Sequence, residues 1–353
     1  MESITQYYII SHMRILIATG IYPPDIGGPA QYTVSIEKEF RNQGHTVLVK
    51  HYTKIERILP IGIRHIYFAL KSFLTYLRAD QVLVLDTFSV AFPIYILSLL
   101  TGKRYTIRTG GDFLWENYVE RTRKDVLLRN FYSQETGNLT GKERIIFWLT
   151  KKIVQRAEYM VFSTTWQKNI WLPVYGIDER KTRLVENYYN VVSEAKTPST
   201  PEDESKVFML GCRELYWKNK KMAIRVLERL QRDFPRLQIE IDDKTYPHAE
   251  YIERMKKAYA TVLVSLGDIS PNMMLDSVRA GTPFVLTKEN GITERLQGLG
   301  VFVEPLHEED IYQKIVSLLN PEIYADCKKR IKNYAFIHTW KEIAAEFIQI
   351  WQR

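Results

Sequence analysis

The sequence predicts an α/β protein made of two doubly wound domains, each with a parallel sheet covered by helices on both faces. The chain has 353 residues, more than one hydrophobic core usually serves. Short apolar, β-branched runs recur, and each ends abruptly in Gly, Ser, Thr or Asp before a helix-like stretch. Residues 193–206 interrupt this pattern with Pro, Ser, Thr and acidic residues, which is a linker composition.

The apolar runs predict the strands of both sheets. They lie at 14–20, 82–86, 105–112 and 159–163, and then at 207–211, 238–242, 261–265 and 283–287. Near-continuous apolar strands that alternate with helices are typical of parallel sheets. We therefore expect an N-terminal domain at 1–192, a linker at 193–206, a second domain at 207–335 and a final helix at 336–353.

One run, residues 82–100, has the apolar character of a membrane span. Asp86 lies in its middle, and Pro93 would break a single continuous helix. A buried strand followed by a core helix accounts for the run better than a transmembrane segment does.

Charge and cysteine content narrow the functional classes. The formal net charge is +8, with 25 basic against 18 acidic residues through residue 195 and 24 against 23 beyond it. A basic N-terminal half suits an anionic membrane surface or a phosphorylated acceptor, and equally suits simple solubility. Two distant cysteines fit a reducing compartment, so we expect a cytoplasmic protein. No nucleic-acid-binding module is recognisable, and we expect no nucleic-acid partner.

Ligands of doubly wound sheets bind beyond the carboxyl ends of the strands. After the first strand, Gly27 and Gly28 precede a helix, where the backbone can approach an anion closely. The spacing differs from Gly-x-Gly-x-x-Gly, which removes the fingerprint of a nicotinamide cofactor. An ordinary turn is the alternative explanation for these glycines.

The strand at 207–211 leads into two cations five residues apart, Arg213 and Lys218. The fork of an arginine suits phosphate oxygens, and a lysine adds a point charge, so the pair can grip a diphosphate. A solvated basic loop is the alternative.

The strand at 261–265 leads into a loop that holds Asp268 and then into a short helix that contains Asp276. Ser270 and Pro271 are a good N-cap and first-turn pair, and Gly281 is a good helix stop. The helix should point its positive end into the crevice. A surface pair between Asp276 and Arg279 is the alternative for that acid.

In this order, the motifs resemble glycosyltransferase family 4, the retaining enzymes of the GT-B fold. The family has Gly-Arg-Leu with a Lys five residues after the Arg, then Glu, seven residues and a second Glu that leads into Ala-x-Ala-x-Gly-x-Pro. The matching residues here are Gly211, Arg213, Lys218, Asp268, Asp276, Ala280, Gly281 and Pro283, followed by Gly291 and Glu294. Residues 185–190 resemble the family's domain-junction motif, and 338–340 resemble the start of its last helix.

The resemblance implies the architecture and the roles of these residues. It implies a central cleft between the domains and a C-terminal helix that crosses back to the N-terminal domain. Arg213 and Lys218 would stabilise charge on the leaving diphosphate, which needs no metal or cofactor. Asp268 would contact donor-sugar hydroxyls and Asp276 the ribose, while Gly27, Gly28 and Asn272 complete the expected donor site.

Asp112 is the predicted catalytic residue on the acceptor side. It stands at the end of the run at 105–112, where family members carry a functional His or Asp, and it would orient the acceptor hydroxyl or stabilise charge at the anomeric carbon. A cap for the helix after it is the alternative role. Glu116 is a weaker candidate.

The expected activity is therefore transfer, with retention, of a hexose-type sugar from a nucleotide-diphosphate sugar to a glycan or lipid-linked acceptor. Both acids are glutamates in the family, so the shorter aspartates leave open a degenerate, non-catalytic binding protein. A sugar-nucleotide epimerase of the same fold is the other alternative. Residues 121–152 are basic and aromatic, so this segment is a candidate for peripheral attachment to the inner face of a membrane. An ordinary solvated helix pair is the alternative.

Overall fold

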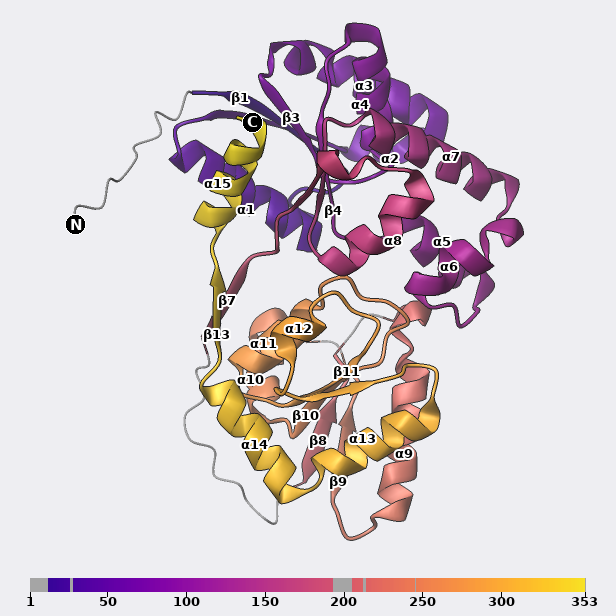
Figure 1. The fold of residues 1–353 in the computed structure, drawn as a ribbon, viewed down its shortest axis with the longest axis vertical. Coiled ribbons are helices and arrows are strands. Elements are labelled where there is room, and N and C mark those ends of the chain that lie inside the picture. Colours follow the sequence, from indigo (N-terminus) through magenta and orange to yellow (C-terminus); the bar gives the residue numbers. More distant parts are fainter. Residues whose placement is uncertain (1–11, 26–27, 193–204, 212–213, 245, 353) are drawn as a thin grey trace, which may run out of the picture.

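The computed structural model describes residues 12–25, 28–192, 205–211, 214–244 and 246–352. Two α/β domains lie one above the other in Figure 1, and most of the predicted linker lies outside the described residues. All strand pairs within both large sheets are parallel. The predicted doubly wound architecture is confirmed.

The N-terminal domain has a six-stranded sheet in the order β2-β1-β3-β4-β5-β6. Its strands are β1 (Arg14–Thr19), β2 (Thr46–His51), β3 (Gln81–Val84), β4 (Thr106–Thr109), β5 (Tyr159–Phe162) and β6 (Thr182–Leu184). Its helices are α1 (Gly28–Asn42), α2 (Lys54–Ile58), α3 (Ile61–Arg78), α4 (Ala91–Thr101), α5 (Phe113–Thr122), α6 (Leu128–Gln134), α7 (Gly141–Arg156) and α8 (Thr165–Tyr175). Short 3-10 turns lie at η1 (Thr136–Asn138) and η2 (Glu179–Lys181).

The C-terminal domain has a five-stranded sheet in the order β12-β11-β10-β8-β9. Its strands are β8 (Lys206–Met209), β9 (Ile239–Asp242), β10 (Ala260–Leu263), β11 (Phe284–Thr287) and β12 (Val301–Val303). Its helices are α9 (Lys220–Asp233), α10 (His248–Lys257), α11 (Asn272–Arg279), α12 (Thr293–Leu296), α13 (Glu308–Leu318) and α14 (Pro321–Lys332), with a 3-10 turn, η3 (Tyr216–Lys218), before α9.

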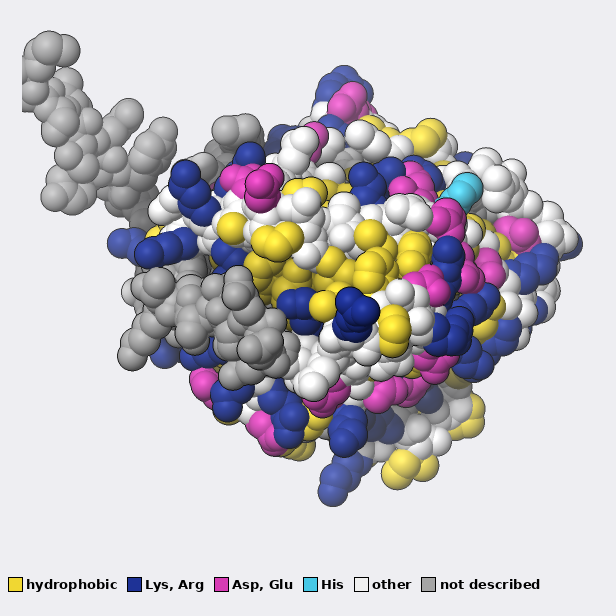
Figure 2. All heavy atoms as spheres, turned by 90° about the horizontal axis from the view of Figure 1, so that it is seen from below, with side chains coloured by type: hydrophobic (Ala, Val, Ile, Leu, Met, Phe, Trp, Pro, Cys, Tyr) yellow, Lys and Arg dark blue, Asp and Glu magenta, His cyan; other side chains and the backbone are white. Residues whose placement is uncertain are grey.

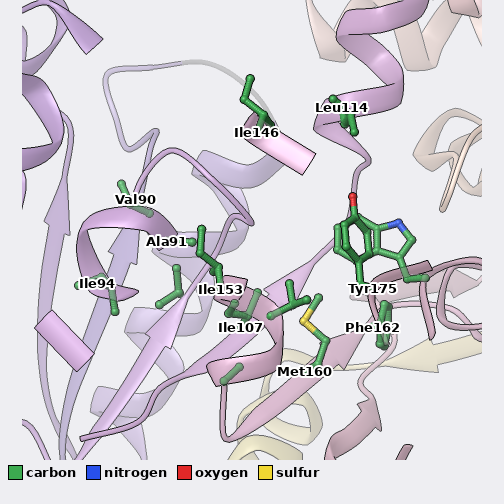
Figure 3. Close-up of a cluster of buried hydrophobic side chains, with 14 of the residues drawn as sticks. Val90, Ala91, Ile94, Ile107, Leu114, Ile146, Ile153, Met160, Phe162 and Tyr175 are labelled. Carbon is green, nitrogen blue, oxygen red and sulfur yellow. The ribbon is translucent and has the colours of Figure 1, made fainter. Parts of the chain in front are cut away.

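Strand β1 shows why near-continuous apolar runs become central strands. Leu16 and Ala18 face one hydrophobic core, whereas Ile15 and Ile17 face the core on the other side of the sheet. Figure 3 shows part of the first core, where side chains from several helices and strands converge. Because such a strand is buried on both faces, it has no position for a polar side chain, and its sequence is a near-continuous apolar run.

The two domains are joined twice along the chain. Strands β7 (Tyr189–Val192) and β13 (Ala335–His338) pair antiparallel between them. After β13, helix α15 (Trp340–Trp351) returns to the N-terminal domain, as Figure 1 shows, and packs Phe347 against Phe40 of α1. Thr339 and Glu342 form a capping box that begins α15. The predicted return of the last helix is confirmed.

The apolar run at 82–100 becomes the end of β3, a loop and α4, as expected. None of the helices in the described part of the chain is both long and apolar enough to cross a bilayer. Figure 2, which looks at the free end of the C-terminal domain, shows Lys and Arg interspersed with Asp and Glu around an apolar area. This mixture agrees with the nearly balanced charge of the second half of the sequence.

The domains also touch directly beside the cleft. The Leu128 N–H of α6 donates to the Leu266 carbonyl oxygen over 3.1 Å. A Cβ on Gly267 would lie 2.7 Å from Leu128 Cβ and 3.0 Å from Trp115 Cη2, so only glycine allows this approach. Trp217 packs against Trp115, with ring centroids 5.6 Å apart. The two carboxyl edges therefore face each other across a narrow gap.

Candidate active site

A cleft of about 940 Å³ lies between the carboxyl edges of the two sheets. Both domains line it, and so do the residues of the β7 junction and the start of α15. Pockets of this size hold drug-sized ligands and cofactors. Of the described site residues that the sequence predicts, the cleft brings together Gly28, Asp112, Lys218, Asp268, Asn272 and Asp276. Gly27 and Arg213 lie outside the described residues.

Lys218 and Asp268 form the electrostatic centre of the C-terminal side. The Lys218 Nζ lies 2.5 Å from Asp268 Oδ2, and both side chains are largely buried. The ammonium also lies 4.3 Å from the centre of the Trp217 ring. The Asp268 N–H donates to the Glu289 carbonyl oxygen over 2.8 Å, which fixes the loop that carries the acid. A lysine has three N–H donors, so this ammonium can serve an incoming anion and Asp268 together.

Asp276 and Asn272 lie on α11, whose N-terminal end faces the cleft. Arg279 Nη2 pairs with Asp276 Oδ1 at 2.8 Å, so the ion pair that was the alternative explanation is present, although both residues also line the cleft. The predicted cap is wrong by one residue. Helix α11 begins at Asn272 with Pro271 in the cap position and no side-chain cap, and the Ser270 hydroxyl lies 3.1 Å from the Tyr189 hydroxyl. The predicted stop at Gly281 has the expected positive φ of 78°.

Asp112 is buried and caps α5. Its Oδ1 accepts the Trp115 N–H over 3.0 Å, and its Oδ2 accepts the Tyr132 hydroxyl over 2.7 Å and the Trp171 indole N–H over 2.9 Å. Burial raises the pKa of Asp112, and these donors oppose that rise. The structure thus supports the helix-cap role that the sequence left as the alternative, while a direct contact with substrate stays a prediction.

Glu116, one turn further along α5, has the more exposed carboxyl group. It lines the cleft, and the hydrogen bond that it receives from the Asp112 N–H is long, at 3.4 Å. Burial and then the Asp112 carboxylate raise the pKa of Glu116 to about 7, and the positive charge of Lys218 opposes them. The negative charge of Asp268 also raises the pKa of Glu116. A group that titrates near neutrality between the two domains is suited to proton transfer or to holding a hydroxyl group.

Arg108, at the end of β4, is a cleft residue to which the sequence analysis gave no role. Its guanidinium lies over the Tyr32 ring, 3.9 Å from the centroid, and donates to Asn187 Oδ1. Its Nε has no hydrogen-bond partner, and within the described part of the chain no carboxylate pairs with the guanidinium. The signal was an arginine inside a short, mostly buried strand, two residues before Gly110.

Three aromatic rings close this end of the cleft. Tyr188 stacks on Trp340 with centroids 5.2 Å apart and planes 6° apart. Tyr32 meets the edge of the same Trp340 at 5.1 Å. The junction motif and the start of the last helix, which carried part of the family resemblance, therefore meet in the cleft next to Arg108.

No known protein family matches this chain by sequence. No curated protein matches it either. Solved structures do match in three dimensions across almost the whole chain.

HepE from Anabaena, solved with UDP-glucose, is 12% identical, with a TM-score of 0.64 over 96% of this chain and 100% of that chain. Sucrose-phosphate synthase from Thermosynechococcus elongatus is 12% identical, with a TM-score of 0.70 over 97% and 98%. WaaG, a glycosyltransferase involved in lipopolysaccharide biosynthesis, is 12% identical, with a TM-score of 0.64 over 95% and 99%.

These likenesses extend over both domains and the returning helix. Because the sequence identities are low, they establish the fold alone. Together with the two parallel sheets and the cleft between them, they show that this chain has the GT-B fold of the glycosyltransferases.

Proposed function

We propose that this chain is a retaining glycosyltransferase that moves a sugar from a nucleotide-diphosphate sugar to a glycan or lipid-linked acceptor. One observation carries the proposal: the Lys218–Asp268 ion pair lies in an interdomain cleft and faces the carboxyl group of Glu116 from the other domain. HepE, a structure of similar fold, was solved with UDP-glucose, which makes uridine diphosphate sugars the first donors to test.

In the proposed reaction, the bond between the anomeric carbon and the diphosphate oxygen breaks, and the acceptor oxygen bonds to that carbon on the same face. Lys218, together with Arg213, stabilises the negative charge that develops on the leaving diphosphate. Asp268 accepts hydrogen bonds from donor-sugar hydroxyls, and Asp276 accepts them from the ribose. The acceptor's proton passes to the departing phosphate oxygen, and ionised Glu116 holds the acceptor hydroxyl beforehand.

The test is a screen of nucleotide-diphosphate sugars that measures release of the nucleoside diphosphate, with and without acceptor glycans. Lys218→Met and Asp268→Asn should each lower kcat by about a hundredfold or more, the usual cost of losing one preorganised electrostatic contact. Arg213→Ala should behave like Lys218→Met. The control is Lys168→Met, which removes an ion pair of 2.8 Å with Glu179 outside the cleft.

The outcomes separate the alternatives. Release by Lys218→Met and Asp268→Asn at the parent rate would show that the site is assigned wrongly. An altered sugar nucleotide formed without any acceptor would indicate an epimerase. Nucleotide binding without turnover would indicate a degenerate binding protein, and retention is read from the anomeric configuration of the product.

A further inference from the structure

Helices α2 and α3 present an apolar face to solvent. The most exposed of its side chains are Ile58, Leu70 and Leu74, at 84%, 71% and 62%. The other large exposed apolar residues of these two helices are Ile55, Ile61, Ile63, Ile66, Phe73 and Leu77. On α3, the exposed positions from 63 to 77 recur every three or four residues and form one stripe, while the opposite face packs Phe68 and Tyr76 into the core. Contiguous exposed apolar surface of this kind marks an interaction site.

The charged residues of helices α2 and α3 are mostly basic, and Asp25 of a neighbouring loop pairs with one of them, Arg57. Helices α2 and α3 carry five basic residues, Lys54, Arg57, Arg64, Lys71 and Arg78. Their one acidic residue, Glu56, has a fully buried side chain that is paired with Lys71. The free end of the C-terminal domain in Figure 2 differs, because acidic and basic side chains both surround its apolar area.

The apolar face continues onto α4. Leu99 and Leu100 at the end of that helix are exposed, and Lys103 and Arg104 follow them. The Lys103 ammonium donates to the Tyr76 carbonyl oxygen over 3.2 Å, which places the end of α4 beside the end of α3. Figure 1 shows both helices at the periphery of the N-terminal domain.

We propose that the apolar face of α2 and α3 is a membrane-docking surface that rests on an anionic lipid bilayer. Apolar side chains bury themselves among lipid chains, and the surrounding lysines and arginines meet the negatively charged headgroups. A second copy of the chain fits less well, since a two-fold contact through this face would set Lys54 and Arg78 against the same cations.

A row of aromatic rings leads from this surface to the cleft. His65 of α3 meets the edges of Phe88 and Phe92, which stack on each other 6.2 Å apart. Phe88 then stacks on Phe113, which lines the cleft, at 6.1 Å. Docking by α3 would therefore bring the cleft to the membrane surface, where a lipid-linked acceptor is found. This link to the cleft rests on the proposed function, whereas lipid binding does not depend on it.

The segment 121–152, which the sequence raised as a membrane contact, is a poorer candidate. Phe131 and Tyr132 are buried in the core, and Arg121 is paired with Glu143. Its exposed apolar residues, Ile145 and Trp148 on α7, form a small group. They provide a matched control.

The test is flotation of the full chain with vesicles of phosphatidylcholine, with and without phosphatidylglycerol. The parent should bind the anionic vesicles, and the double variant Leu70→Glu with Leu74→Glu should bind at least tenfold less. The control, Ile145→Glu with Trp148→Glu, should bind like the parent. Because all four positions are exposed, folding should persist, and circular dichroism checks this. A milder pair, Ile63→Ser with Ile66→Ser, should show a partial loss.

Three results would overturn the proposal. The first is a parent that binds no vesicles. The second is a loss of binding in the α7 control but not in the α3 variant. The third is a parent that sediments as a dimer and becomes a monomer with Leu70→Glu and Leu74→Glu, because the face would then join two copies of the chain. A lack of glycosyltransferase activity would leave this test unaffected.

Discussion

Arg129 on α6 forms a 2.8 Å ion pair with Glu289, whose side chain is fully buried in the opposite domain. Burial raises the pKa of Glu289 to about 7. The positive charge of Arg129 lowers this pKa, and the negative charge of the neighbouring Glu304 raises it. A direct link between the domains thus contains a group that titrates near neutrality.

Glu289 should make stability depend on pH. Its pKa is higher in the folded protein than the 4.5 of an ordinary glutamate, so the folded state holds the proton more tightly. This contribution is complete below the ordinary pKa and is lost as the pH rises through about 7. Glu289→Gln should therefore reduce the fall in the free energy of unfolding between about pH 5 and about pH 8, by up to about 3 kcal/mol.

Urea unfolding at both pH values measures this effect. Glu308→Gln is the control, because Glu308 pairs at 3.4 Å with an exposed arginine, Arg225, and is itself exposed. An equal pH dependence in the parent and in Glu289→Gln would contradict the prediction.

Gly267 should be intolerant of any side chain. An alanine there would place its Cβ 2.7 Å from Leu128 Cβ, in a contact between two domains that cannot yield without moving α6. We expect Gly267→Ala to cost about 1–3 kcal/mol of stability, the usual cost of overpacking. Gly141→Ala is the matched control, since a Cβ at that position meets nothing within 4 Å.

A second substitution checks the cause. If the clash is with Leu128, then Leu128→Ala should cost less in the Gly267→Ala background than in the parent, and a double-mutant cycle measures the difference. Additive effects would show that Gly267 is needed for another reason.

Much of the fold follows from local patterns, because central parallel strands are buried on both faces. Two strands of the N-terminal sheet, β2 and β6, escaped prediction because they are its edges. Strand β2 shows the cause: Leu48 is half exposed, and the strand ends in Lys50 and His51. Strand β12 is likewise an edge strand of the second sheet. These three edge strands are short or partly exposed, whereas β9, the other edge of the second sheet, was predicted from Ile239 and Ile241.

The site was predictable where topology alone decides proximity. Lys218 and Asp268 follow neighbouring strands, β8 and β10, so the carboxyl-end rule brings them together. The environment of Asp112 was not predictable, because its partners Tyr132 and Trp171 come from distant helices. The properties of Glu116 depend on charges in the other domain, which a local pattern does not contain.

Glu116 should control the pH dependence of catalysis. If the ionised carboxylate holds the acceptor hydroxyl, kcat/KM should rise with pH through about 7, which is where Glu116 loses its proton. Glu116→Gln should lower kcat by about a hundredfold and remove that rise. Glu158→Gln, an exposed carboxyl outside the cleft, is the control. A pH profile that keeps its rise in Glu116→Gln would assign the ionisation to another group.

Arg108 should bind an anionic group of the substrate. Its guanidinium is held over Tyr32 and by Asn187 but has no carboxylate partner in the described part of the chain, so its charge is available to a phosphate. Charge-assisted hydrogen bonds contribute about 1.5–3 kcal/mol, and Arg108→Ala should therefore weaken binding of inorganic pyrophosphate at least about tenfold. Isothermal titration measures the affinity.

Arg183 provides the matched control for Arg108. It also lies over a tyrosine, 4.9 Å from the centroid of Tyr159, but it is outside the cleft. Arg183→Ala should bind pyrophosphate like the parent, because removing a cation at that position changes only the distant field, which salt screens. Equal losses in the two variants would mean that the net charge of the domain, and not the position of Arg108, attracts the anion. A loss confined to Arg108→Ala would identify its guanidinium as an anion-binding group of the N-terminal side, opposite Lys218.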